Sequence, residues 1–376
     1  MNKIIFKCQA ITPMFLGGAD NEPDLRPPSI KGAMRYWWRA MYGHLSIEKL
    51  KEKESDIFGN TEQRSKVTLR CRTSHEPKEF IETFRKAKAG EKGELEGMEY
   101  LFYSMDLGKN NRQYFDNIPF EVILKSKDKH EAQLKEAAYA FWLLANLGGI
   151  GSRSRRGGGS FIITDIEDDS HLGFDFRLDV QSADAWVDYL KKGIQTIKHH
   201  AKVKDIKDKT RFNSFQNIDI YLVNELHGEA EDALNFIGER FQKFREEEGG
   251  KDAYNVGNYV DNGSHIPTIE KASFGLPISY RFEVGKNKFI SATVEPKSEI
   301  YNRSASSLFI SIVQIGGKYY ALLVNFNSTL LPTGICLKVS TKRQRKVYPK
   351  PPHNTLKQDF IKSLKPLNSL KTIQIL

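Results

Sequence analysis

The sequence lacks the marks of several large classes of protein. Its 376 residues include only three cysteines, which are far apart and form no CxxC pair: Cys8, Cys71 and Cys336. A zinc ribbon or a disulfide framework is therefore not expected. No apolar run approaches the roughly 18 residues of a membrane-spanning helix, and no secretory signal is recognised at the N-terminus. We expect a cytoplasmic protein with no membrane partner.

Patterns that mark catalysis are also missing. The nine histidines show neither HxxxH nor H-E-x-x-H spacing, and no Cys/His nucleophile pattern is present. Asp20 and Asp24 lie in a Gly/Pro-rich loop, where such residues are usually turn formers. The aromatic RNP1 pattern is absent, so base stacking on an open sheet is not the expected binding mode. We predict no catalytic residues, no metal and no cofactor.

The positive charge is concentrated at one end of the chain. The formal net charge is +10, and the pI is about 9.2. From Ile300 onward the chain has twelve Lys/Arg and a single acid, Asp359, so that residues 1–299 sum to −1. An excess of this size suggests a polyanionic partner. Any polyanion-binding site in the first half must therefore be a local patch of positive charge on a neutral background.

Hydrophobic periodicity in the first half predicts strands at Lys3–Thr12, Val67–Arg72, Ile118–Lys125 and from Phe161, and helices at Ile30–Leu45 and Glu131–Leu147. Gly148 is placed to cap the second helix. The segment Phe80–Asn117 mixes charge with glycine and is interpreted as an insertion. The order β-α-β-β-α-β is the ferredoxin-like or RRM-like pattern. A doubly wound sheet is the alternative, but the strand pair within 67–125 breaks its alternation.

The second half has a similar but less regular pattern. Possible strands lie at Phe176–Val180 and Ile218–Val223, and helices at Ala183–Lys202 and Glu229–Glu247. β-rich stretches follow at Pro277–Phe282, Phe289–Val294, Leu308–Ile315 and Tyr319–Asn325. We predict an α+β protein of two ferredoxin-like (RRM-like) βαββαβ domains, 1–170 and 171–376, with the second elaborated. The basic, proline-bearing run Lys342–Pro352 is predicted to be a mobile connector, and Thr355–Leu364 a short helix.

A basic helix is the first candidate binding element. Lys31, Arg35 and Arg39 are spaced i, i+4, i+8, which places them in one row with neighbouring side chains about 6 Å apart. A row at that pitch can follow the phosphates of a single strand. Ser29 is the predicted N-cap. Trp37 and Trp38 either offer a surface for stacking or belong to the hydrophobic core, and burial in the core is the favoured interpretation.

A glycine–arginine loop, GGIGSRSRRGGG at Gly148–Gly159, is the second candidate. Glycines such as Gly149, Gly151, Gly157 and Gly158 let backbone N–H groups approach a phosphate. Arg153, Arg155 and Arg156 supply bidentate phosphate recognition. A nucleotide-binding P-loop runs strand–loop–helix and ends in GK[ST]. Here the order is helix–loop–strand and GK[ST] is absent.

These two motifs carry a family resemblance. The glycine-rich loop after the last helix of a ferredoxin-like domain resembles the RAMP superfamily of CRISPR proteins. The run TPMFLGGADNEPDLRPPSIKGAMRYWWRAMYG, residues 12–43, is similar to the first Cmr subunit of type III-B effector complexes. The pieces SFGLPI at Ser273–Ile278 and SASSLFIS at Ser304–Ser311 support the same resemblance.

The resemblance implies two ferredoxin-like domains and a non-catalytic subunit of a type III-B Cmr complex in antiviral defence. Its expected partners are guide (CRISPR) RNA near the 3′ part, target RNA, or both, together with neighbouring Cmr subunits. Two alternatives remain open. One is a metal-independent RAMP endoribonuclease that processes CRISPR RNA, with His44 as the acid/base candidate. The other is a scaffold whose basic C-terminal region meets other protein subunits.

Overall fold

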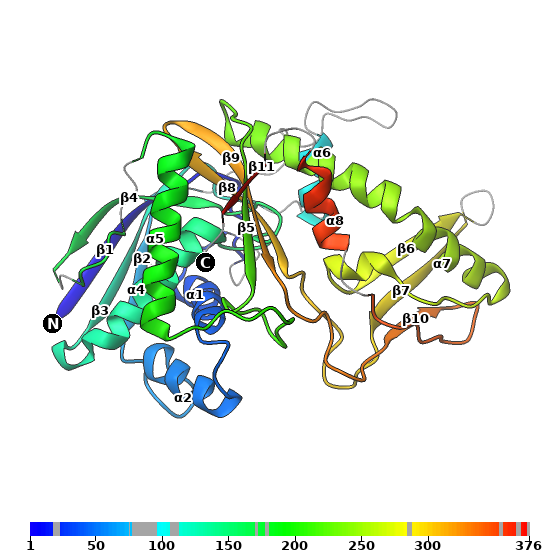
Figure 1. The fold of residues 1–376 in the computed structure, drawn as a ribbon, viewed down its shortest axis with the longest axis horizontal. Coiled ribbons are helices and arrows are strands. Elements are labelled where there is room, and N and C mark those ends of the chain that lie inside the picture. Colours follow the sequence, from blue (N-terminus) through cyan, green and yellow to red (C-terminus); the bar gives the residue numbers. More distant parts are fainter. Residues whose placement is uncertain are drawn as a thin grey trace.

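A computed structural model describes residues 1–17, 23–74, 76, 96–105, 113–169, 172–176, 180–283, 288–352, 356–365 and 370–373. These described residues form helices and three antiparallel sheets, which confirms the predicted α+β class. In Figure 1 the sheet that contains β1 (Asn2–Ala10) lies at the left, the sheet that contains β6 (Ile278–Glu283) lies at the right, and the sheet that contains β5 (Ile218–Val223) lies between them. No helix in these described ranges is long and apolar enough to cross a membrane.

The first sheet has the strand order β2-β3-β1-β4, with bounds Thr68–Arg72, Pro119–Ser126, Asn2–Ala10 and Phe161–Asp168. Alternate residues of β1 (Ile4, Phe6, Cys8 and Ala10) are buried, as expected for a sheet with one covered face. Helices α1 (Pro27–Met41) and α4 (Glu131–Leu147) cover that face. Gly148 is the C-cap of α4, as predicted: its N–H donates to the carbonyl of Leu144.

The second sheet has the order β11-β5-β9-β8, with bounds Leu370–Ile373, Ile218–Val223, Lys318–Phe326 and Leu308–Ile315. Strands β8 and β9 read as apolar runs rather than alternating patterns because both of their faces are covered. The first half, with α5 (Ala183–Ala201), covers one face. Helices α6 (Ala230–Glu248) and α8 (Leu356–Ser363) cover the other.

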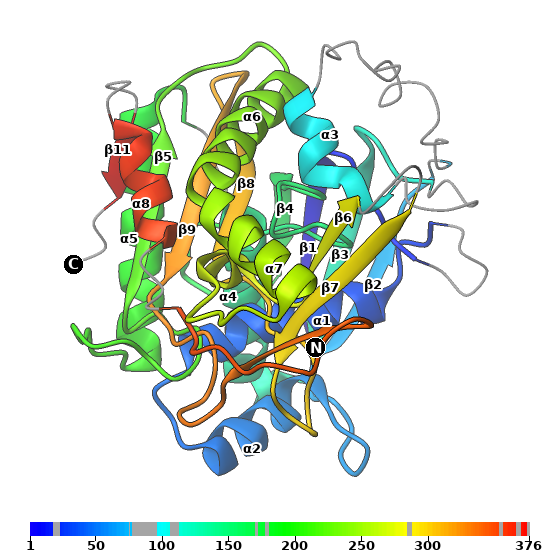
Figure 2. The same cartoon turned by 90° about the vertical axis from the view of Figure 1, so that its right-hand side faces the viewer.

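The remaining β-strands form a separate lobe that the sequence pattern did not resolve. β10 (Leu337–Thr341), β7 (Phe289–Pro296) and β6 (Ile278–Glu283) make a three-stranded sheet. Helix α7 (Gly250–Asn262) and the 3-10 turn η3 (Glu270–Phe274) complete its core. Figure 2 shows this lobe facing the viewer, with α7 beside β6 and β7.

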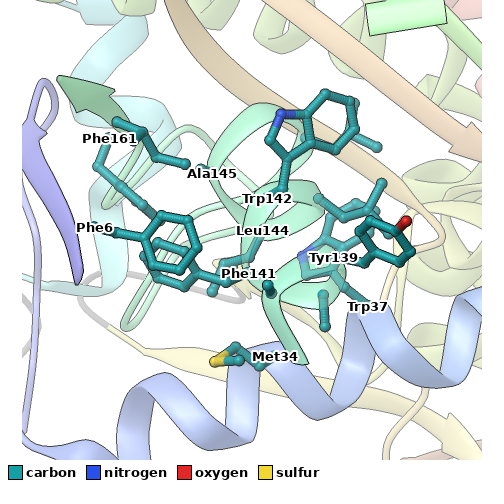
Figure 3. Packing of buried hydrophobic residues seen from close by; sticks show 14 of the residues in the cluster. Phe6, Met34, Trp37, Tyr139, Phe141, Trp142, Leu144, Ala145 and Phe161 are labelled. Atoms are coloured by element: carbon teal, nitrogen blue, oxygen red, sulfur yellow. The ribbon is translucent and has the colours of Figure 1, made fainter. Parts of the chain in front are cut away.

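The largest hydrophobic cluster joins the first sheet to the second. Side chains from β1, α1, α4 and β4 meet in it, including Phe6, Trp37, Phe141 and Phe161 (Figure 3). Trp37 and Trp38 are 1% and 0% exposed, so the favoured interpretation of both as core residues is confirmed. α4 is buried on nearly every side because it lies between the first sheet, α1 and the second sheet.

Two local predictions are wrong, and one helix was missed. Helix α1 begins at Pro27 after an Arg26 N-cap, so the assignment of Ser29 as N-cap is wrong. Prolines suit the first helical positions because their missing N–H groups would have no intrahelical acceptor there. The connector at Lys342–Pro352 is wrong too: Val347 pairs with Val339 of β10, and Lys350 N–H donates to Pro267. Helix α2 (Ile47–Phe58) was missed.

An inserted helix ties the first half to the second. α3 (Glu96–Phe102) packs on α6, as Figure 2 shows at the top of the molecule. The two backbones meet where a Cβ on Gly238 would lie 2.1 Å from the carbonyl oxygen of Gly97. The Asn235 carboxamide on α6 accepts hydrogen bonds from the N–H groups of Gly97 (2.9 Å) and Met98 (3.3 Å). It thereby caps the N-terminus of α3 from another helix. Residues 177–179, the middle of the strand expected at Phe176–Val180, and most of the Phe80–Asn117 insertion lie outside the described residues.

Gly238→Ala tests this helix crossing. The added methyl group has no room against the α3 backbone, so we expect a loss of about 2 kcal/mol in the free energy of unfolding, measured by urea denaturation. Gly32→Ala is the matched control, because Gly32 is also helical and has nothing within 4 Å. It should gain up to about 1 kcal/mol through helix propensity. Equal effects of the two substitutions would contradict the close crossing.

Candidate functional site

The glycine–arginine loop is not free; it lies along the edge of the second sheet. Gly157 N–H donates to the Ile310 carbonyl of β8 (2.8 Å), and Ile310 N–H donates to the Arg155 carbonyl (3.2 Å). Arg156 and Ile310 form a parallel bridge. β8 is the outer strand of its sheet, so the loop occupies hydrogen-bonding groups that an edge strand otherwise leaves open. The loop of the first half is therefore built into the sheet of the second.

The loop glycines are required by close backbone contacts. A Cβ on Gly149 would lie 2.5 Å from the carbonyl oxygen of Gly158, and one on Gly159 would lie 1.9 Å from that of Ile150. Gly157 has φ +85° and faces Leu234 of α6. The N–H groups of Ile150, Ser152 and Arg156 to Gly159 donate to protein carbonyls. These donors serve the loop's own structure.

Arg156 points into the protein. Its guanidinium donates to the carbonyl oxygens of Phe274 (3.0 Å) and Leu308 (3.2 Å), and it lies over the ring of Phe241 at 5.0 Å. Burial, with a smaller contribution from the charge of Arg245, lowers the pKa of Arg156 to about 9. The side chain thus clamps the loop to β8 and η3.

Arg153 and Arg155 leave the loop toward different neighbours. Arg153 has φ +62° and lies over the ring of Tyr103, 4.5 Å from its centroid. Arg155 donates to the carbonyl of Ser306, and its guanidinium lies over two adjoining rings, 4.9 Å from the centroid of Tyr36 and 4.6 Å from that of Phe309. The charge of Arg155 opposes the effect of burial on Tyr36, and the net result raises the pKa of that phenol to about 12.

The cation row of α1 lies against α2. Lys31 donates to the Phe58 carbonyl (3.4 Å), and Arg35 donates to Phe58 (3.1 Å) and Gly59. These carbonyls end α2, where the helix dipole favours cations. Arg39 makes a bidentate pair with the buried carboxylate of Glu54, at 2.5 and 2.7 Å. The predicted i, i+4, i+8 spacing therefore serves, at least in part, to attach α2.

Two predicted cations, Arg39 from the helix and Arg155 from the loop, line the same cavity of about 660 Å³. Helices α1 and α2 form one wall. The second half supplies the others through loops near 211–213, 301–305 and 328–332. Sequence reasoning missed the residues that these loops contribute, including Arg211, Phe212 and Arg303. The charge excess after Ile300 was the only hint, and it did not single out Arg303.

The cavity is strongly cationic. Five basic side chains and one acid line it: Arg39, Lys51, Arg155, Arg211, Arg303 and Glu54. Glu54 is already paired with Arg39 and Arg35. In the described part of the chain no carboxylate lies within 4.0 Å of Lys51, Arg155, Arg211 or Arg303. Focused positive potential of this kind attracts anions.

The residues considered for catalysis lie elsewhere. His44 does not line the cavity; its Nδ1 is buried without a partner among the described residues, and burial lowers its pKa. Asp24 is exposed, and Asp20 lies outside the described residues. A search of the described ranges finds no group of three His, Cys, Asp or Glu able to hold a metal.

One further cation lies behind the cavity wall. Lys357 of α8 is 2% exposed and donates to the hydroxyl of Ser307, which lines the cavity. Burial, with a smaller contribution from Lys209, lowers the pKa of Lys357 to about 8. This buried charge adds to the positive potential at the Ser307 wall.

Comparison with known proteins identifies the family to which the chain belongs. The model of the RAMP superfamily matches residues 7–162. Two proteins of Pyrococcus furiosus are similar. "CRISPR system Cmr subunit Cmr1-1" is 28% identical over 320 residues, covering 82% of each chain. "CRISPR system Cmr subunit Cmr1-2" is 37% identical over 180 residues, 43% of this chain and 94% of the relative. The chain belongs to the RAMP superfamily and, within it, to the family of Cmr1 subunits.

Solved structures agree in fold. The crystal structure of apo Cmr1 from Pyrococcus furiosus matches with a TM-score of 0.65 at 22% identity, covering 99% of both chains. A chain of the type III-B Cmr-beta complex bound to cognate target RNA, solved by cryo-EM, matches with a TM-score of 0.52 at 13% identity. That match covers 97% of this chain and 99% of the other.

Lys357→Met tests the buried charge. The unfolded chain keeps an ordinary lysine pKa near 10.5, so between about pH 8 and 10.5 the unfolded state binds more protons. Stability of the natural chain should therefore rise with pH through this window. Lys357→Met should be more stable at pH 7 by up to about 3 kcal/mol, and this advantage should vanish by pH 10.5. Urea denaturation at pH 7, 9 and 10.5 measures the difference in the free energy of unfolding between the variant and the natural chain. If that difference does not change with pH, the lowered pKa of Lys357 is refuted.

Proposed function

We propose that this protein is a non-catalytic, RNA-binding subunit of a type III-B Cmr effector complex in antiviral defence. Membership of the Cmr1 family supports the subunit assignment, and a similar chain occurs in a Cmr complex bound to cognate target RNA. Its partners are CRISPR RNA, target RNA or both, and other Cmr subunits. A cytoplasmic location follows from this role and stays a prediction.

We infer that both halves are ferredoxin-like, with boundaries near 1–170 and 171–376. Counting strands along each half, both four-stranded sheets have the order second-third-first-fourth or its reverse. The second half differs by its inserted three-stranded lobe. In this assignment the glycine–arginine loop joins the domains, and the cavity lies where they meet.

The cavity is the observation that carries the RNA assignment. It combines one cation from the basic helix, Arg39, with one from the loop, Arg155, and adds Arg211 and Arg303 from the second half, which pair with no carboxylate among the described residues. Among the predicted site residues, Arg155 is the one best placed to meet a phosphate. Arg156, Gly149, Gly151, Gly157 and Gly158 act by fixing the loop, and Lys31 and Arg35 by fixing α2.

The geometry supports binding rather than cleavage. Metal-independent RNA cleavage needs an acid/base group within reach of the ribose and phosphate. His44 lies outside the cavity, and a lowered pKa leaves it largely uncharged at neutral pH. We therefore assign no catalytic residue to the site.

The charge-neutralising double variant R211Q/R303Q tests the site. Each lost phosphate contact should reduce the slope of log K against log salt by about 0.7 for a single strand. We expect a slope smaller by about 1.4 and weaker binding of a labelled, unstructured single-stranded RNA at low salt. Fluorescence anisotropy of the full chain across a salt series measures both quantities.

Lys192→Gln is the matched control, because Lys192 is an exposed cation on α5 away from the cavity. Its slope should equal that of the natural chain. An unchanged slope in a folded R211Q/R303Q variant would remove the cavity from the RNA-binding surface.

A further inference from the structure

We propose that the cavity seats an unpaired nucleobase against the ring of Phe212, so that the site recognises single-stranded rather than duplex RNA. This inference rests on the proposed function and specifies how the same site is used. It concerns the apolar part of the cavity, which phosphate binding does not explain.

Phe212 is held open to solvent by its neighbours. The side chain is 50% exposed and lines the cavity. Two residues before it, Thr210 N–H donates to the Asn327 carbonyl (3.0 Å), and Thr329 N–H donates to the Thr210 carbonyl (2.9 Å). One residue after it, the Asn213 carboxamide donates to the Tyr36 hydroxyl (2.6 Å). The backbone is thus fixed on both sides of an exposed aromatic ring.

A second anchor fixes the same loop to the first half. Phe215 N–H donates to the Ala40 carbonyl of α1 (3.0 Å), and the Phe215 ring is buried beside Trp37 and Phe326. Asn213 also accepts a hydrogen bond from the Ser328 hydroxyl (2.5 Å). In this loop, Phe215 and Asn213 are residues that pack against the rest of the protein. The side chain of Phe212 therefore remains at the cavity. A large apolar side chain kept exposed at a preformed site marks a binding function.

The facing walls of the cavity are also apolar. Leu45, Ile47 and Leu50 line it from the start of α2, and Leu330 and Leu331 line it from the loop after β9. Ile47 is 40% exposed. A space of about 660 Å³ is within the range of pockets that hold small planar ligands. The walls suit the face and edges of an aromatic base.

Cations surround this apolar space. The guanidinium of Arg211 lies 5.0 Å from the Phe212 ring centroid, and Arg155 and Arg303 line the same cavity. An aromatic ring next to unpaired cations suits a nucleotide, whose base stacks while its phosphate meets the positive charge. An apolar peptide side chain would satisfy the walls but leave the cations unpaired. In a duplex the bases are already stacked and paired, so only an unpaired base can enter.

The test uses the full chain and three labelled RNA probes in anisotropy titrations. The probes are an unstructured 12-nucleotide single strand, the same strand with its central nucleotides abasic, and a duplex of the same length. Phe212→Ala should weaken binding of the intact strand roughly tenfold with no change in salt slope. Phe212→Tyr should restore binding. Abasic RNA should bind the natural chain and Phe212→Ala equally.

Phe289→Ala is the matched control. Phe289 on β7 is 48% exposed and lies under Arg281 at 4.0 Å, the same pairing of ring and guanidinium but away from the cavity. It should bind all three probes as the natural chain does.

Suppose that RNA binding depends on salt but changes neither with abasic substitution nor with Phe212→Ala. That result would overturn the nucleobase site and leave the proposed function intact. A Phe212→Ala chain that binds RNA normally but fails to join purified Cmr subunits would overturn it in favour of a protein side chain. Absence of salt-dependent RNA binding by the natural chain would overturn both proposals.

Discussion

The structure depends on a few hydrogen bonds between a loop and a strand edge. By pairing Arg155 and Gly157 with Ile310, the glycine–arginine loop joins the first half to the second sheet. The clamp from Arg156 to two carbonyls fixes the side on which Arg155 emerges. A side chain is useful for recognition only if its position is set beforehand, because ordering it on binding costs free energy. The loop provides that order through the backbone of Arg155, whose carbonyl accepts from Ile310.

Regular elements with strong patterns were predictable from sequence. The bounds of α4, β5 and β8 were predicted without error, since long apolar runs and a glycine cap mark them. The three-stranded lobe was missed. The patterns of β6 and β7 predict strands, but a local pattern does not show with which other strand each one pairs. Helix α2 was overlooked although Ser46 caps it and Leu50 and Ile57 are at helical spacing.

Only part of the site was predictable, because a local pattern does not show which residues packing brings together. Spacing and composition drew attention to Arg39 and Arg155, which line the cavity, but they could not tell a phosphate-binding cation from one that serves a carbonyl or a carboxylate. Lys31 and Arg156 have the second kind of partner. Arg211 and Phe212 lie in one loop and Arg303 in another, both of ordinary composition. Only the packing of the two halves brings them to one cavity.

The cap that Asn235 places on α3 has a consequence for biosynthesis. The residues of α3 are translated more than a hundred positions before Asn235, and a helix of seven residues is not stable alone. On the ribosome, where the N-terminal part folds first, α3 must wait for α6 to be made. The order of synthesis and the order of assembly therefore differ, and the nascent first half leaves Met98 and Phe102 without the contacts that α6 later supplies.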